Sequence, residues 1–106
     1  NFASVVAQKG VPGTSAYAAS KASLWEMSKA LAIGNGNKNI TINNINLGYF
    51  NIGMIEQVPV DYLDTLVQSI PAKRLGTPEE ILSTVRFIID NSYLNGASID
   101  LNGGLL

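Results

Sequence analysis

The sequence has 106 residues, of which 46% are apolar and 14% charged, and its formal net charge is −1. This composition is too apolar for a disordered chain, lacks the basic excess of a nucleic-acid binder and contains no apolar run of the ~18 residues that a membrane span needs. Because Cys and His are absent, disulfides, zinc–thiolate sites and histidine bases are excluded, and any catalysis must use Tyr, Lys, Ser, Asp or Glu. We therefore expect a cytoplasmic protein that binds neither nucleic acid, membrane nor metal.

The sequence begins without Met and inside an apolar run that covers residues 2–7. Because a natural domain rarely begins in the middle of a buried strand, we expect these residues to be the C-terminal part of a longer protein. Residues 1–6 predict a short buried strand, and the Gly- and Pro-containing residues 7–15 predict a loop.

A long helix is predicted next, from about residue 16 to residue 33, by small and apolar side chains at helical spacing. The Gly-Asn-Gly-Asn sequence at 34–37 is expected to end it, because Gly and Asn tolerate the left-handed conformation of a helix C-cap. We interpret Trp25 in this helix as a packing residue.

A second strand is predicted over residues 39–47, which are rich in β-branched side chains. Within it, Asn43, Asn44 and Asn46 stand where a parallel sheet is expected to have apolar residues. A buried amide without a partner costs about 1–3 kcal/mol. A long loop, from 48 to about 59, follows this strand.

The remaining elements are two helices and a third strand. Residues 60–70 predict a short helix. Thr77 is the expected N-cap of the next helix and Glu80 completes a Thr-x-x-Glu capping box, with Pro at the first helical position. That helix is expected to reach residue 90, and four side chains are expected to face the core: Ile81, Val85, Ile88 and Ile89. Residues 97–101 predict the third strand.

This order of elements predicts an α/β fold in which helical crossovers connect three parallel strands. Both faces of a parallel sheet must be covered, and three strands are too few for a doubly wound sheet. We therefore expect the missing strands to precede residue 1.

Three residues can carry chemistry: Ser4, Tyr17 and Lys21. Ser4 lies at the end of the first predicted strand, where the ligand crevice of a parallel sheet lies. Tyr17 and Lys21 are four residues apart, so they share one face at the start of the long helix, at the same end of the sheet. From this spacing alone, an ordinary pair on a helix surface is the commoner explanation. Together with Ser4, the pair can converge on one point.

Such a trio suits proton transfer to a carbonyl oxygen. An ammonium about 5 Å from a phenol, at an effective dielectric constant of about 20, favours the phenolate by about 3 kcal/mol. This interaction lowers the pKa of a phenol from about 10 by about 2, which makes Tyr17 a general acid or base. Ser4 can hydrogen-bond the same oxygen. Since no side chain carries hydride to the carbonyl carbon, a nicotinamide cofactor is required.

The sequence resembles the short-chain dehydrogenase/reductase family over nearly all of its length. The matching features are Ser4 placed 13 residues before Tyr17, the Tyr-x-x-x-Lys motif YAASK, the segments NITINNINLG and IPAKRLGTPEEI, and the terminal LNGG. Within the family, the resemblance is greatest to 3-oxoacyl thioester reductases, including acetoacetyl-CoA reductases. It implies the C-terminal part of a Rossmann-type doubly wound parallel sheet, with the dinucleotide-binding fingerprint in an N-terminal half that is absent from this sequence.

The resemblance also implies roles for the three residues. Tyr17 is the catalytic acid or base and also contacts the cofactor, NADPH or NADH. Lys21 lowers the pKa of Tyr17 and holds the nicotinamide ribose, and Ser4 positions the substrate carbonyl. It further implies a homo-oligomer, a dimer or tetramer. The substrate is a small carbonyl compound, an acyl thioester among the candidates.

The loop after the second strand is implied to bind the cofactor. The backbone at Gly48, Tyr49 and Phe50 contacts the nicotinamide amide, and the Tyr49 side chain is a candidate for substrate contact. The family usually has Pro and Thr where this sequence has Leu47 and Ile52, and Ile52 supplies no hydroxyl to the cofactor.

Two alternatives to an active reductase stay open. The first is a truncated or degenerate homologue that only associates with related subunits. The missing half and the departures at Leu47 and Ile52 favour this alternative. An epimerase or dehydratase of the same family shares the Tyr-x-x-x-Lys pair. The KRLGTPEEI and LNGG segments fit a classical reductase better.

Overall fold

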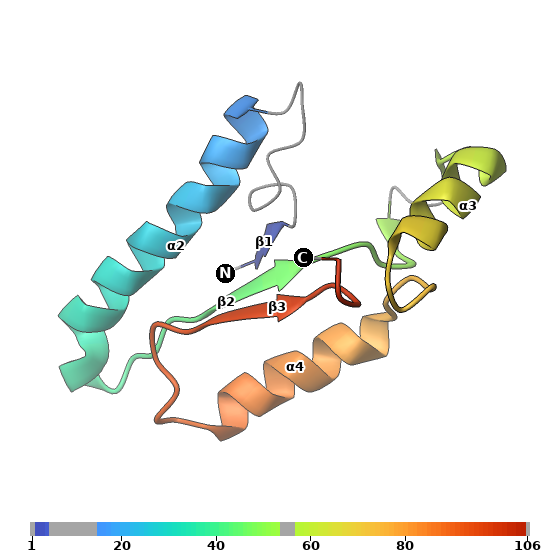
Figure 1. Ribbon diagram of the computed structural model, residues 1–106. Helices are drawn as coiled ribbons and strands as arrows, with labels where there is room; N and C mark the ends of the chain where they lie inside the picture. The colour runs from blue at the N-terminus through green and yellow to red at the C-terminus, as the bar shows by residue number, and fades with distance from the viewer. Residues whose placement is uncertain (1, 5–14, 54–56, 106) are drawn as a thin grey trace.

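The computed structural model describes residues 2–4, 15–53 and 57–105, with the backbone alone for residues 3, 4 and 15–18 (Figure 1). Its elements are, in chain order, β1 (Phe2–Ser4), α2 (Ser15–Asn35), the 3₁₀ turn η1 (Gly36–Lys38), β2 (Asn44–Leu47), α3 (Val60–Ser69), α4 (Pro78–Asp90) and β3 (Ser98–Leu101). Within the described ranges, no helix has the length and apolar character required to cross a membrane. The expected strand–helix–strand–two helices–strand order is confirmed.

The three strands form one parallel sheet in the order β1-β2-β3, as predicted. Ser4 lies opposite Leu47 on the middle strand, and Leu47 lies opposite Leu101. The last residues of all three strands are therefore in register at one edge of the sheet, which we call the carboxyl edge.

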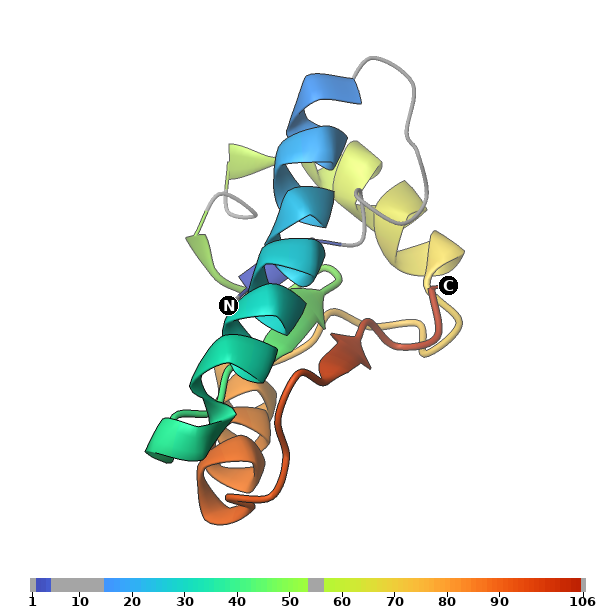
Figure 2. The ribbon, with the colours of Figure 1, turned by 90° about the vertical axis from the view of Figure 1, so that its left-hand side faces the viewer.

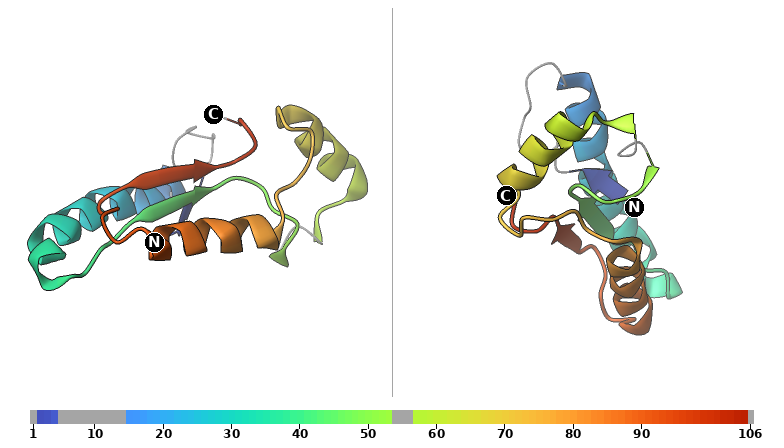
Figure 3. Two further views of the ribbon diagram at one scale, coloured as in Figure 1. Left: turned by 90° about the horizontal axis from the view of Figure 1, so that it is seen from below. Right: turned by 90° about the vertical axis from the view of Figure 1, so that its right-hand side faces the viewer.

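Helices α2 and α4 lie on opposite faces of the sheet, and α3 lies beyond its carboxyl edge (Figures 1 and 3). Helix α2 runs roughly antiparallel to the strands, so it begins on the side of the carboxyl edge and its first turn extends beyond the sheet (Figures 1 and 2). This is the layer arrangement of an α/β domain.

The middle strand β2 alternates between its two layers. Asn44 and Asn46 hydrogen-bond side chains of α2, whereas the side chain of Ile45, which is 3% exposed, faces the hollow beneath α4. Asn43 is also buried; its Oδ1 accepts from the N–H of Ala97 at 2.9 Å and its Nδ2 donates to Leu94 O at 3.1 Å. All three amides have partners, so the cost of unpaired asparagines does not arise.

Two predicted boundaries are wrong around the end of α2. The helix continues through Gly34 to Asn35, and the residue in the left-handed region is Asn39, with φ of 58°. A 3₁₀ turn tightens the helix end before that residue, which delays the reversal of the chain. The second strand begins at Asn44, not at residue 39, because the preceding backbone bonds a side chain instead: the N–H of Ile42 donates to Asn95 Oδ1 at 3.0 Å.

Helix α4 begins as predicted. Thr77 Oγ1 accepts from the N–H of Glu80 at 3.3 Å, and Glu80 Oε1 accepts from the N–H of Thr77 at 3.0 Å. Of the four side chains expected to face the core, three are half-buried. Ile89 is 71% exposed, because it borders an open hollow of about 260 Å³ between α4 and the sheet.

Candidate functional site

The backbone places the three candidate catalytic residues at one end of the sheet. Ser4 is the last residue of β1, Tyr17 is the third residue of α2, and Lys21 follows one helical turn later. Helix α2 begins on the side of the sheet where the strands end, and its first turn extends beyond β1 (Figure 1). The Ser4 and Tyr17 side chains lie outside the described residues, so their meeting around one oxygen stays a prediction.

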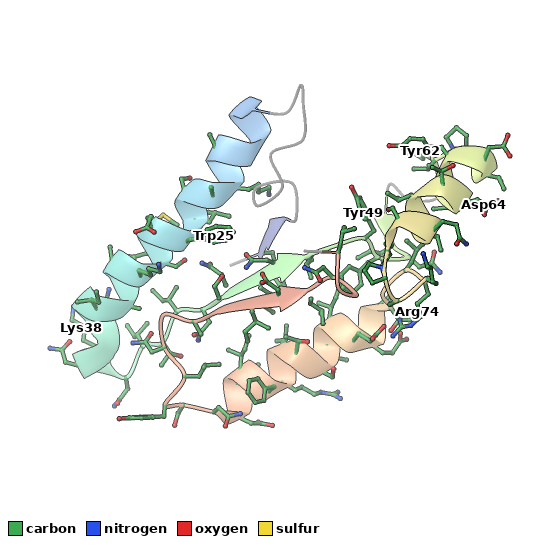
Figure 4. The ribbon with its side chains drawn as sticks, viewed as in Figure 1. Trp25, Lys38, Tyr49, Tyr62, Asp64 and Arg74 are labelled. Carbon is green, nitrogen blue, oxygen red and sulfur yellow. The ribbon has the colours of Figure 1, made fainter. Side chains whose placement is uncertain are left out.

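The face of α2 that carries Lys21 is turned to the sheet. Lys21 is half-buried, and the next residue on this face, Trp25, donates from Nε1 to Asn46 Oδ1 at 2.7 Å (Figure 4). One turn further, Ser28 Oγ, which is 1% exposed, donates to Asn44 Oδ1 at 2.9 Å. Two hydrogen bonds therefore join this face of α2 to β2, and the Trp25–Asn46 bond is the one nearer the carboxyl edge.

The loop after β2 is held against the loop after β3. The N–H of Gly48 donates to Leu101 O at 2.9 Å. A Cβ added at Gly48 would lie 2.8 Å from the Cα of Asn102. Only glycine permits this close approach of two backbones.

Phe50 pairs with Gly76 in an isolated parallel bridge. The carbonyl of Tyr49 accepts from the N–H of Gly76, and the N–H of Asn51 donates to the carbonyl of Gly76, both at 2.9 Å. The aromatic ring of Phe50 lies where a Cβ of Gly76 would stand, so its side chain is a packing element. Phe50 is 7% exposed.

The backbone N–H and C=O of Phe50 itself face away from this bridge, because successive peptide groups of an extended chain point to alternate sides. Among residues 2–4, 15–53 and 57–105, neither group has a hydrogen-bond partner. Buried backbone groups are rarely left unpaired. A ligand group that offers one hydrogen-bond acceptor and one donor, such as a carboxamide, would match this pair.

A cavity of about 50 Å³ lies between the two loops, with Tyr49 and Asn102 among its walls. It has room for a few water molecules and not for an acyl thioester. One wall is the ion pair of Arg74 with Glu80, whose two N···O distances are 2.7 and 3.0 Å. The guanidinium of Arg74, and after it the N–H of Thr77, lowers the pKa of Glu80 to about 2.

This pair ties the start of α4 to the segment before it, and Figure 4 shows Arg74 near the α3–α4 connection, apart from Trp25. Arg74 therefore has a structural role at this helix start. Gly103 and Gly104 have φ of 66° and 88°, a backbone conformation that favours glycine. In the part of the chain that the structure describes, no three acidic side chains gather where they could hold a metal ion.

Sequence reasoning missed two features of the site, the Trp25–Asn46 hydrogen bond and the Phe50–Gly76 bridge. For the first, a signal was available: Trp25 follows Lys21 by one turn, and Asn44 and Asn46 alternate along a strand, as side chains facing one layer do. For the Phe50–Gly76 bridge, we can identify no signal in the sequence.

Comparisons with known proteins match nearly the whole chain and its fold. The model of the enoyl-(acyl carrier protein) reductase family matches residues 1–106. An acetoacetyl-CoA reductase of Cupriavidus necator is 39% identical over 107 residues, which cover 99% of this chain and 44% of the relative. A 3-oxoacyl-(acyl-carrier-protein) reductase of Chlamydia muridarum is 36% identical and is matched over 43% of its length.

A crystal structure from Brucella melitensis, described as a short-chain dehydrogenase/reductase of the glucose/ribitol dehydrogenase type, superimposes with a TM-score of 0.88 at 29% identity. The match covers 99% of this chain and 43% of that one. The chain thus spans less than half the length of each of these relatives.

Proposed function

Because this chain belongs to the short-chain dehydrogenase/reductase family, we propose that residues 1–106 are the C-terminal half of a single reductase domain. The complete domain uses NADPH or NADH to reduce a ketone, that of a 3-oxoacyl thioester, to a hydroxy compound. The observation that carries the proposal is that Ser4 ends β1 while Tyr17 and Lys21 lie in the first two turns of α2, the helix that follows β1 in the chain. The two reductases at 39% and 36% identity support the substrate class.

In the proposed reaction, Tyr17 gives its proton to the carbonyl oxygen while the carbonyl carbon receives hydride. A bound NADPH or NADH supplies that hydride, which no side chain can carry. Ser4 hydrogen-bonds the carbonyl oxygen and holds it against Tyr17. The positive charge of Lys21 stabilises the phenolate that proton transfer leaves behind, and Tyr17 regains its proton from solvent.

The chain also offers groups that suit the cofactor. The N–H and C=O of Phe50 match a carboxamide, and the ammonium of Lys21 is a donor for ribose hydroxyls. The backbone at Gly48 and Tyr49 completes the proposed contact with the cofactor. Ile52 is 43% exposed in this loop and contributes no hydroxyl, so these backbone groups carry the recognition.

We further propose a homo-oligomer. Met27 and Leu31 lie one turn apart on α2, away from the face that Trp25 turns to the sheet, and they are 48% and 42% exposed. Covering such a pair by a second copy removes apolar surface from water.

The proposal is tested with the full-length protein, acetoacetyl-CoA and either nucleotide. We expect oxidation of NADPH or NADH that depends on the thioester and yields one 3-hydroxybutyryl-CoA per nucleotide. A folded protein that binds neither nucleotide and still associates with copies of itself would contradict the reductase proposal and favour the association module.

A further inference from the structure

We propose that Trp25 and Asn46 are positioning residues for the reaction: their hydrogen bond sets the rotation of α2 and thereby places Tyr17 and Lys21 relative to Ser4. This inference rests on the proposed function. Neither residue is assigned to contact the substrate or the cofactor.

The first argument is the place of the bond. Trp25 follows Lys21 by four residues and Tyr17 by eight, so all three positions share one face of α2. On the sheet side, Asn46 lies opposite residue 3 and is followed by Leu47, which lies opposite Ser4. The bond therefore joins the helix turn after Lys21, about 6 Å along the axis, to the strand residue just before the carboxyl edge.

The second argument is the rigidity of the Asn46 amide. Asn46 is 2% exposed, and its Nδ2 donates to Ser98 Oγ and to Asp100 Oδ1, both at 2.8 Å. An indole N–H can only donate and an ionised carboxylate can only accept, so the amide has one possible orientation between Trp25 and Asp100. The acceptor that holds Trp25 is thus fixed by two bonds to the neighbouring strand β3.

The third argument is the sensitivity of the reaction to rotation. Side chains extend about 5–6 Å from a helix axis, so a rotation of about 10° moves their ends by about 1 Å. A displacement of about 1 Å can cost about 10²-fold in rate. Ser4 stands on β1 and does not follow α2, so any rotation changes its distance to Tyr17. Tyr17 and Lys21 move together, and their mutual distance is preserved.

The test uses Trp25→Phe in the full-length protein, which removes the N–H and keeps an aromatic ring. With acetoacetyl-CoA and saturating NADPH, we expect kcat to fall at least about ten-fold. The Kd of NADPH should rise by a smaller factor, because Lys21 moves with α2 whereas the backbone groups of Phe50 do not. The midpoint of the kcat–pH profile should stay unchanged, because Tyr17 and Lys21 ride on the same helix. A loss of stability alone would lower Tm and leave kcat intact well below Tm.

Ser28→Ala is the matched control, since it removes the other α2–β2 hydrogen bond, further from the carboxyl edge. It should lower Tm to a similar extent and keep kcat within about two-fold. Asn46→Leu supplies a second variant: it should reproduce the kcat loss, and the double variant Trp25→Phe/Asn46→Leu should lose no more than either single one.

Three outcomes overturn the inference: wild-type kcat in Trp25→Phe, equal kcat losses in Trp25→Phe and Ser28→Ala, or losses that multiply in the double variant. None of these outcomes contradicts the proposed function as long as the Tyr17→Phe protein is inactive. Failure of the proposed function is recognised separately, by an active Tyr17→Phe protein or by a wild type that reduces no thioester.

Discussion

Gly48 and Asn102 approach each other so closely that a Cβ on Gly48 would stand 2.8 Å from the Cα of Asn102. The two residues follow β2 and β3 directly, and the contact fixes how both loops leave the carboxyl edge. We expect Gly48→Ala to force the loops apart and to lower the free energy of unfolding by about 1–3 kcal/mol. Urea unfolding of the full-length protein measures this.

Gly34→Ala is the control for that substitution. Gly34 is the second-last residue of α2, and a Cβ there meets nothing within 4 Å among the described residues. Alanine is the better helix former, so Gly34→Ala should stabilise the protein, by no more than the roughly 0.5–1 kcal/mol that is typical of a helix interior. If both alanine variants have the same stability, the close approach does not constrain the loops.

Glu80 gives the protein a distinct dependence on acid. Its pKa in the folded protein is about 2, below the ordinary value of 4.5, because Arg74 and the N–H of Thr77 stabilise the carboxylate. A lowered folded pKa means that the unfolded chain binds the proton first, so stability is present above pH 4.5 and is lost as the pH falls towards 2. Glu80→Gln should remove this component of the pH dependence.

Glu79→Gln is the matched comparison, because Glu79 lies in the same first turn of α4. Measurements of unfolding free energy between pH 5 and about 2 should give parallel curves for wild type and Glu79→Gln, and a flatter curve for Glu80→Gln. Parallel curves for all three proteins would show that the Arg74 pair does not depend on the charge of Glu80.

Asn43 holds the segment that leads into β3, through its bonds to the N–H of Ala97 and to Leu94 O. Asn43→Ala leaves both backbone groups without these partners. We expect a loss of about 1–3 kcal/mol in the free energy of unfolding. The exposed residue Asn37 serves as control, and Asn37→Ala should change stability by less than about 0.5 kcal/mol. Equal effects of the two substitutions would contradict the role of the buried amide.

The parts of this fold that sequence predicts well depend on local signals. The start of α4 follows from Thr77 and Glu80, which lie three residues apart and bond each other. The strand predicted from residue 39 failed in its first half, because β-branched residues favour a strand only where a partner strand lies opposite. The first residue of β2 with such a partner is Asn44, opposite Ser98.

In the site, too, local signals predict some features and tertiary contacts determine the others. The spacing of Tyr17 and Lys21 predicts one helix face, and the parallel sheet predicts Ser4 at the carboxyl edge. Trp25 and Asn46 are 21 residues apart, and although the spacing of each indicates the layer that it faces, no local rule pairs the two residues. The Phe50–Gly76 bridge spans a still longer interval and depends on how α3 returns the chain. Contacts of this kind follow from the tertiary arrangement alone.

The assignment of Tyr17 as the proton donor is tested most directly by the turnover of Tyr17→Phe in the full-length protein with NADPH and acetoacetyl-CoA. Loss of the proton donor should lower kcat by about 10²–10⁴-fold, while the Kd of NADPH changes less than about two-fold. Tyr93→Phe, at a fully exposed tyrosine, should behave as wild type. A Tyr17→Phe protein that turns over acetoacetyl-CoA at the wild-type rate would contradict the assignment of Tyr17 as the proton donor.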